Sequence, residues 1–203
     1  METKEDTYHH KDLRNILIET GIAIVAEEGL EGFSLRKVAA ACNVSHAAPY
    51  SHFKNKDQLL EEMQQYITDQ FSLQLQNTLD SCTKPAHALE ALGESYLDFF
   101  LTHRTYFTFL FSQSTIRLNL TDHADSTDNY KPYEIFRHLV MQLLQENNYP
   151  KEKQNDAVIA LWAFIHGITS LATMNNIVYD QDWKKKLHDF MRVFDCPALR
   201  LQK

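Results

Sequence analysis

The sequence has few of the residues that build covalent or metal-bound frameworks. It contains three cysteines, Cys42, Cys82 and Cys196, which are far apart, odd in number and never arranged as CxxC. Neither a disulfide framework nor a zinc ribbon is indicated, and this usage fits a reducing cytoplasm. The ten histidines are scattered, and the adjacent His9 and His10 fall in an expected flexible arm. We therefore predict no cofactor and no metal site.

Long apolar runs and common catalytic motifs are also lacking. No apolar run approaches the length of a membrane span, and no secretory signal is expected in the polar start METKEDTYHHKD. The HExxH motif, the glycine-rich GK[ST] phosphate loop and the GxSxG motif are all absent. We therefore expect a cytoplasmic protein that is not an enzyme and has no membrane partner.

One stretch lacks acidic residues altogether. From Ser34 to Lys56 there are four cations, Arg36, Lys37, Lys54 and Lys56, and no carboxylate, although the whole protein has a formal net charge of -7. Phosphate contacts require a local basic surface of this kind, even on an acidic protein. A solvated basic face on an ordinary helical hairpin would carry the same charges, so charge alone leaves both interpretations open.

The same stretch predicts two short helices joined by a tight turn. Ser34 is placed to cap the first helix, which continues through the alanines at 39–41. Asn43 stands at the turn, because asparagine tolerates the left-handed conformation better than most residues. Ser45 offers a second cap, for a helix beginning at His46. This layout is a helix-turn-helix, whose second helix enters the DNA major groove.

A specific order of residues follows the turn. The stretch at 44–60 reads VSHAAPYSHFKNKDQLL, and it follows the Phe-Ser and Val-Ala pairs of the first helix. Over residues 12–60 this order resembles the DNA-binding domain of the TetR family of transcriptional regulators. Two departures are Asn43, where the family usually has glycine, and the Ala-Ala-Pro before Tyr50. Pro49 lacks a backbone donor and is expected to distort or limit the first turn of the second helix.

The resemblance implies roles for eight residues. Phosphate contacts set affinity and register without reading the sequence, whereas contacts to base edges read it. The implied phosphate contacts are Ser34, Tyr50, His52 and Lys56, and the implied base contacts are Arg36, Ser45, His46 and Ala47. For His52 a packing role remains the alternative, and Phe53 is expected to plug the core under the second helix.

Apolar periodicity predicts an all-α fold of about nine helices. We expect a flexible arm at 1–11, a helix-turn-helix domain at 12–58 and a larger helical ligand-binding and dimerisation domain at 59–203. Gly29 is expected to stop the helix predicted at 12–28, and Asn55 is expected to cap the long helix that follows the helix-turn-helix.

The segments that follow are less regular or more apolar. The polar segment 113–131 predicts a loop that is either functional or disordered. The expected helix at about 151–175 is apolar nearly all round, so one of its faces needs a partner beyond its own chain.

In the TetR family the last two helices pair across a two-fold axis. The resemblance therefore implies a homodimer through the expected helices at 151–175 and 182–194. Such a dimer would bind a near-palindromic double-stranded operator, with half-sites about 34–36 Å apart or a multiple of that distance. The run WAFIHG at 162–167 also resembles the tryptophan–histidine–glycine signature of one TetR-type C-terminal domain.

The resemblance further implies that the larger domain binds a small-molecule effector. An apolar pocket with one or two polar contacts is the usual form of such a site. The candidate lining residues are Tyr96, Phe100, His103, Tyr106, Phe107, Phe136, Trp162 and His166. Aromatic residues at helical spacing are also typical of a core, so both interpretations stay open.

We therefore predict a DNA-binding transcriptional regulator that acts as a repressor and is released from its operator by a mostly apolar effector. The alternative is a helical protein-interaction or ligand-binding dimer without sequence-specific DNA binding. Salt-dependent binding to duplex DNA distinguishes the two functions.

Overall fold

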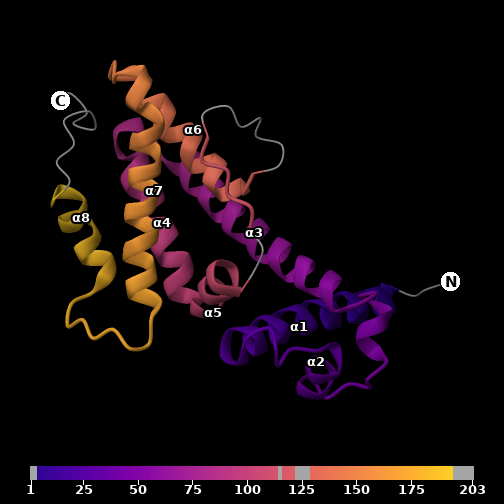
Figure 1. Cartoon of the computed structure of the whole chain (residues 1–203). Helices are drawn as coiled ribbons and strands as arrows, with labels where there is room; N and C mark the ends of the chain where they lie inside the picture. Colours follow the sequence, from indigo (N-terminus) through magenta and orange to yellow (C-terminus); the bar gives the residue numbers. More distant parts are fainter. Residues whose placement is uncertain (1–3, 114–115, 122–128, 194–203) are drawn as a thin grey trace. The chain divides into compact units, whose positions relative to one another are not determined.

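A computed structural model describes residues 4–113, 116–121 and 129–193. Within these ranges the chain forms eight α-helices and no strand, which confirms the all-α fold (Figure 1). The α-helices are α1 (Lys4–Glu28), α2 (Leu35–Ala41), α3 (Lys56–Ser81), α4 (Pro85–Thr102), α5 (Arg104–Thr108), α6 (Lys131–Glu146), α7 (Lys151–Thr173) and α8 (Trp183–Val193). Two shorter helices are the 3-10 helix η1 (Ala48–Ser51) and the π-helix η2 (Phe109–Gln113).

The chain divides into two compact units that differ from the expected domains. The first unit takes Met1–Ile67 and Thr105–Ile116, and the second takes Thr68–Arg104 and Arg117–Lys203. The division between these units falls inside α3, after Ile67, while the domain boundary after residue 58 stays a prediction. Periodicity does not locate that division, because the apolar stripe of α3 continues without a break.

The segment 105–116 belongs to the first unit, although its place in the sequence assigned it to the larger domain. Its residues Tyr106, Phe107, Phe109 and Leu110 are buried, and η2 packs against α1. A segment that buries its apolar side chains joins the core that it covers, whatever its distance in the sequence.

Helix α1 begins earlier than expected and ends where expected. It starts at Lys4, so residues 4–11 are helical and are not part of an arm; no proline or glycine in that stretch stops the helix. Gly29 follows its last residue with a φ of 76°, which confirms the predicted stop. A Cβ at Gly21 would lie 2.9 Å from Met63 Sδ, so the missing side chain lets α1 and α3 approach closely.

The start of α2 and the turn after it have the predicted local geometry. The hydroxyl oxygen of Ser34 accepts a hydrogen bond from the Lys37 N–H at 3.2 Å. Asn43 adopts a φ of 55°, as the tight turn requires. At the end of α2, the Cys42 thiol donates to Thr20 Oγ1 at 3.2 Å and so ties α2 to α1.

Helix α3 has the predicted cap and one buried apolar face. Asn55 Oδ1 accepts from the Gln58 N–H at 2.8 Å, and Gln58 Oε1 accepts from the Lys54 N–H at 2.7 Å. These two bonds satisfy backbone donors at the start of α3, although Gln58 accepts from Lys54 and not, as in a full capping box, from the cap residue Asn55. The buried stripe, spaced by four residues, is Leu59, Met63, Ile67, Phe71 and Leu75.

The second unit has its core where α4, α6 and α7 meet (Figure 1). Helix α8 packs against α4. Trp162 of α7 lies at the centre of this core. The rings of Tyr96, Tyr133 and Phe136 stand edge-on to its indole at centroid distances of 5.3, 5.2 and 5.4 Å. Edge-to-face pairs of this kind add to the stabilisation from burial.

Helix α7 is long and apolar enough to cross a membrane by length and composition alone, contrary to the expectation from the sequence. Its residues Val158, Trp162, Ile165 and Ala172 are buried in the second unit, and 33% of its most apolar window is buried. Its exposed residues include Leu171, which is 43% exposed. The second unit therefore leaves part of the apolar surface of α7 uncovered.

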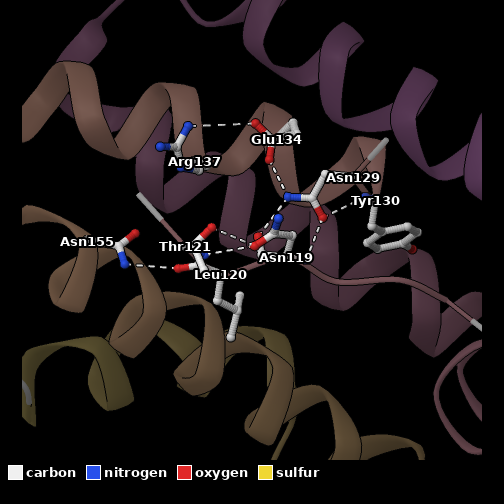
Figure 2. A network of polar contacts seen from close by, with 8 residues as sticks. All are labelled: Asn119, Leu120, Thr121, Asn129, Tyr130, Glu134, Arg137 and Asn155. Carbon is white, nitrogen blue, oxygen red and sulfur yellow. Dashed lines mark hydrogen bonds and ion pairs between the residues drawn. The ribbon is translucent and has the colours of Figure 1, made fainter. Parts of the chain in front are cut away.

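The chain that leads into α6 is held by an asparagine network (Figure 2). Asn129 Oδ1 accepts from the Asn119 and Tyr130 N–H groups at 2.8 and 2.9 Å. Asn129 Nδ2 donates to the Asn119 carbonyl at 2.8 Å and to Glu134 Oε1 at 2.5 Å. One amide therefore joins residues 116–121 to the start of α6.

A second bond in the same network reaches α7. Asn155 Nδ2 donates to the Leu120 carbonyl at 2.9 Å (Figure 2). Residues 116–121 have neither helical nor strand structure, and residues 114–115 and 122–128 of the expected loop lie outside the described ranges. Residues 116–121 are thus fixed by side-chain amides and not by a regular backbone ladder.

Candidate nucleic-acid interface

The second element of the helix-turn-helix is shorter than predicted. The predicted α-helix beginning at His46 is wrong, because the chain there forms a turn followed by the four-residue η1. Ser45 does not act as a side-chain cap; its carbonyl accepts from the Ala48 N–H at 2.9 Å. The expected distortion by Pro49 is confirmed. Proline supplies no N–H, and its ring disfavours the α conformation at Ala48.

The tight turn keeps the predicted contact residues at the surface. Tyr50 projects from η1 with 61% of its surface exposed, while Pro49 beside it is buried. The exposed members of the predicted set are Ser34, Arg36, Ser45, His46, Ala47 and Tyr50, and the half-buried members are His52 and Lys56. Because η1 packs against α2, these residues belong to one small module.

The four cations of the acid-free stretch fall into two pairs. Lys37 forms an ion pair with Glu28, and Lys56 Nζ donates to the Leu30 carbonyl at 2.8 Å. Neither Arg36 nor Lys54, both exposed, pairs with a carboxylate within the described residues. Arg36 and Lys54 are therefore the charges most available to an external anion.

Lys56 is held in place by more than one contact. Besides its bond to Leu30, its ammonium lies 5.6 Å from the centroid of the Phe33 ring. An ammonium has three donors, so a phosphate contact remains compatible with this position.

Sequence reasoning missed these partners. Leu30 and Glu28 precede the acid-free stretch, and their contacts depend on how α1, α2 and α3 pack.

Phe53 is the predicted plug beneath this module. Its side chain is 1% exposed, and the Arg14 guanidinium lies 5.7 Å from its ring centroid. Arg14 Nη2 in turn contacts Glu62 Oε2 of α3 at 2.5 Å. His52, whose ring centroid lies 6.1 Å from that of Phe53, is half-buried, which suits the packing role as well as a phosphate contact.

The residues predicted to bind an effector fall in three places. Tyr96, Phe100, Phe136, Trp162 and His166 belong to the second unit, Tyr106 and Phe107 belong to the first, and His103 lines a surface groove. The eight predicted effector-binding residues therefore do not line a single pocket. The reason is that apolar periodicity reports burial in a helix face but does not say which core that face joins.

The second-unit group contains a polar pair among its aromatic rings. Tyr96 Oη and His166 Nδ1 lie 3.0 Å apart. Burial lowers the pKa of His166 and raises the pKa of Tyr96. Both side chains are therefore neutral near pH 7, and their contact is a hydrogen bond between neutral groups.

Tyr106 has a different partner in the first unit. Its hydroxyl donates to Glu19 Oε1 at 2.5 Å, and the Tyr66 hydroxyl donates to the same oxygen at 2.6 Å. One carboxylate of α1 thus connects α3 and α5. Sequence spacing gave no signal for this contact, because its members lie in three separate helices.

A groove runs along the second-unit part of α3 and the end of α4. It has a volume of about 470 Å³ and is lined by Gln70, Leu73, Gln74, Asn77, Thr78, Ser81, Phe99 and His103. None of these is a carboxylate, lysine or arginine. In the described part of the chain, no three His, Cys, Asp or Glu side chains form a group that could hold a metal ion.

Comparison with known proteins places both parts of the chain in one family. Residues 17–63 match the family model described as bacterial regulatory proteins, tetR family. Residues 89–191, about half of the chain, match the model described as tetracyclin repressor-like, C-terminal domain.

Two curated relatives match over shorter stretches. The HTH-type transcriptional repressor KstR2 of Mycolicibacterium smegmatis is 29% identical over 79 residues, which cover 39% of this chain and 38% of that protein. The "Probable acrEF/envCD operon repressor" of Escherichia coli K12 is 48% identical over 50 residues, which cover 25% of this chain and 23% of that protein. The chain thus matches less than half of the length of these relatives.

The fold extends to solved structures. A bacterial regulatory protein in the tetR family from Rhodococcus RHA1 superposes with a TM-score of 0.67 at 16% identity, covering 93% of this chain and 95% of that chain. Likeness at this identity shows a shared fold.

Proposed function

Because this chain belongs to the TetR family, whose members are DNA-binding regulators and not enzymes, we propose that it is a cytoplasmic repressor that binds an operator as a homodimer. The observation that carries this proposal is the exposed module at 34–54, where Arg36 and Lys54 pair with no carboxylate among the described residues. The names of the two curated relatives, both repressors, support the direction of regulation.

Base reading is assigned to the residues nearest the turn. Arg36 is long and exposed, and its planar guanidinium suits the O6 and N7 acceptors of guanine. His46 and Ala47 are exposed just before η1. Because η1 is a single helical turn, it presents few side chains to the DNA major groove. Recognition of the bases therefore depends on the turn residues 45–47 as much as on η1 itself.

Phosphate contacts are assigned to the exposed side chains of Ser34, Tyr50 and Lys54. The half-buried Lys56 and His52 are assigned the same role. Ser34 retains its hydroxyl hydrogen for an external acceptor, since the oxygen accepts from Lys37. Tyr50 exposes its ring and hydroxyl together. Glu28 neutralises Lys37, which lowers the positive potential of the module.

The proposed dimer forms through α7 and α8. Support comes from the open apolar surface of α7, including Leu171, and from its exposed small residues Ala160 and Ala163, which permit close helix packing. Two copies related by a two-fold axis would present two modules to a near-palindromic operator. We also assign the C-terminal part to the tryptophan–histidine–glycine subgroup, on Trp162, His166 and Gly167.

The proposed effector is a small, mostly apolar molecule that binds the second unit and favours the DNA-free conformer. Differential affinity for two conformers is what release from the operator requires. The aromatic content around Tyr96 and Trp162 supports an apolar ligand, and His166 supplies a polar group there.

The test begins with selection of duplexes bound from a random pool, followed by fluorescence anisotropy on the selected site. Arg36→Ala is expected to weaken binding to the selected site by about 1–3 kcal/mol and to reduce the preference over mismatched sites. Tyr50→Ala should weaken binding to all sites alike.

Charge-changing variants complete the test. Lys54→Ala should lower the slope of log K against log[salt] by about 0.9, the value for one lost phosphate contact. Lys131→Ala, an equal charge change at the exposed start of α6, should leave that slope unchanged. If a folded dimer bound no duplex at low salt, or if the Lys54 and Lys131 variants behaved alike, the assignment of this module to DNA would be wrong.

A further inference from the structure

The carboxylate of Glu28 gives the module at 34–54 a negative charge that its own sequence lacks. Glu28 is the last residue of α1, and its carboxylate forms an ion pair with the ammonium of Lys37 in α2. Within the described ranges it is the one carboxylate that pairs with a cation of the acid-free stretch. The packing of α1 beside α2 therefore neutralises one of the four positive charges.

The connection between α1 and α2 leaves room for this contact. The chain turns after Glu28 at Gly29, which has a φ of 76°. A Cβ at Gly32 would lie 3.3 Å from Glu28 Oε2, which is closer than side chains normally approach. Because Gly32 has no side chain, the Glu28 carboxylate lies over the connection and reaches Lys37.

Lys37 lies beside a residue that is assigned to phosphate. Its backbone N–H donates to Ser34 Oγ at 3.2 Å, so the two residues share the first turn of α2. Its ammonium sits on a flexible four-carbon stem and has three donors. A phosphate next to Ser34 is therefore within the range of the Lys37 side chain.

The ion pair is exposed enough to exchange its partner. The side chain of Lys37 is 38% exposed and that of Glu28 is 46% exposed. Exposed ion pairs are screened by water and salt and contribute little to stability. Duplex DNA carries one negative phosphate for each nucleotide, and each offers the ammonium an acceptor of the same charge as Glu28.

We propose that Glu28 binds Lys37 in place of a DNA phosphate, so that binding to duplex DNA must first break this ion pair. Glu28 thus lowers the affinity for every duplex alike, because phosphates carry no sequence information. The consequence is weaker binding to the large excess of non-specific sites in a genome, while base reading by Arg36 is unchanged. This inference rests on the proposed DNA-binding function.

The experiment is a double-mutant cycle on Glu28 and Lys37, read by fluorescence anisotropy at one low salt concentration. The full chain is titrated against the duplex selected from the random pool and against a mismatched duplex of the same length. Glu28→Gln is expected to raise the affinity for both duplexes about fivefold, the upper end of the range for one exposed ion pair. The preference for the selected duplex should stay as in the wild type.

The second side of the cycle separates exchange from simple repulsion. Lys37→Met removes the ammonium and keeps the aliphatic stem, and it should weaken binding to both duplexes. When Lys37→Met is present, Glu28→Gln should no longer change the affinity, because the ion pair is already lost. Repulsion between Glu28 and the phosphates would instead give the same gain with or without Lys37.

Glu27→Gln is the matched control. Glu27 is exposed on the same last turn of α1 and carries the same charge, but it is not the carboxylate that contacts Lys37. Its replacement should leave the affinity within about twofold of the wild type, because a separate exposed charge is screened. The thermal unfolding midpoint of each variant is measured as well, and it should stay close to that of the wild type.

Three results would overturn the inference: an unchanged affinity in Glu28→Gln, a gain that persists beside Lys37→Met, or an equal gain in Glu27→Gln. If the wild type binds duplex DNA while one of these results is obtained, the role of Glu28 is wrong and the DNA-binding proposal stands. If the wild type binds neither duplex, both proposals are wrong. The two failures are thereby distinguished in one set of titrations.

Discussion

The double hydrogen bond at Glu19 makes a quantitative prediction about the stability of the first unit. Glu19 Oε1 receives the hydroxyl hydrogens of Tyr66 and Tyr106 at 2.6 and 2.5 Å. Tyr106 is 3% exposed, whereas Glu19 and Tyr66 are half-buried. We expect Tyr106→Phe to destabilise the protein, because it removes a hydrogen bond to a charged group.

The size of the effect follows from the chemistry of the bond. A hydrogen bond to a charged group contributes about 1.5–3 kcal/mol, and partial exposure of the carboxylate favours the lower end. Tyr106→Phe should therefore cost about 1.5–2 kcal/mol. Tyr66→Phe should cost about 1 kcal/mol, since its hydroxyl lies nearer to water.

Replacement of the acceptor provides an internal check. Glu19→Leu removes both bonds and should cost about the sum of the two phenylalanine variants. Glu19→Gln keeps an acceptor oxygen but loses the charge, so its effect should be about half as large. In a protein of this size, 1 kcal/mol shifts Tm by about 2–4 °C, so Tyr106→Phe should lower Tm by about 3–8 °C.

The measurement is urea unfolding followed by circular dichroism, with thermal unfolding as a second readout. Tyr50→Phe is the matched control, because its exposed hydroxyl bonds to no group in the described ranges. It should change stability by less than about 0.5 kcal/mol. If Tyr106→Phe were indistinguishable from this control, the Glu19 contact would contribute nothing to the folded state.

Three further predictions concern other sites. Asn129→Asp should cost about 2–4 kcal/mol in urea unfolding, because it replaces two N–H bonds and brings a carboxylate next to Glu134 Oε1; an unchanged midpoint would contradict the network. Asn43→Val should cost about 1–2 kcal/mol at a φ of 55° while Asn43→Gly should be nearly neutral, and equal stability of the two would show that the turn does not enforce this conformation. Burial lowers the pKa of His166 below its value in the unfolded chain, so the unfolded state binds the proton first as the pH falls. The stability that neutral His166 contributes is therefore present above about pH 6.5 and is lost below that value. His166→Gln should flatten the fall in stability between pH 7.5 and 5.5, whereas His46→Gln at an exposed site should not.

Several local features follow from the residues themselves. The Ser34 cap, the left-handed Asn43, the Gly29 stop and the Asn55 cap each depend on backbone conformations and on donors within a few residues. Such short-range preferences are encoded by neighbouring residue types, and packing between distant segments changes them little. The spacing of buried residues along α3 is predictable for the same reason.

Other predictions required information from distant parts of the chain. The expected helix at His46 is reduced to η1, and although Pro49 predicted a distortion, its extent depends on packing against α2. The start of α1 at Lys4 was also missed, because a polar stretch without helix breakers reads equally well as an arm or as a first turn.

By itself, the sequence determined the module that the family shares: an all-α chain whose N-terminal turn region carries cations and no carboxylates. Only the tertiary structure decided which of those cations remain available, since Lys37 and Lys56 meet Glu28 and Leu30 through the packing of separate helices. It also decided that Tyr106 belongs with Glu19 and not with Trp162. The physical reason is that apolar spacing reports which face of a helix is buried, while the identity of its partner depends on contacts between segments far apart in the chain.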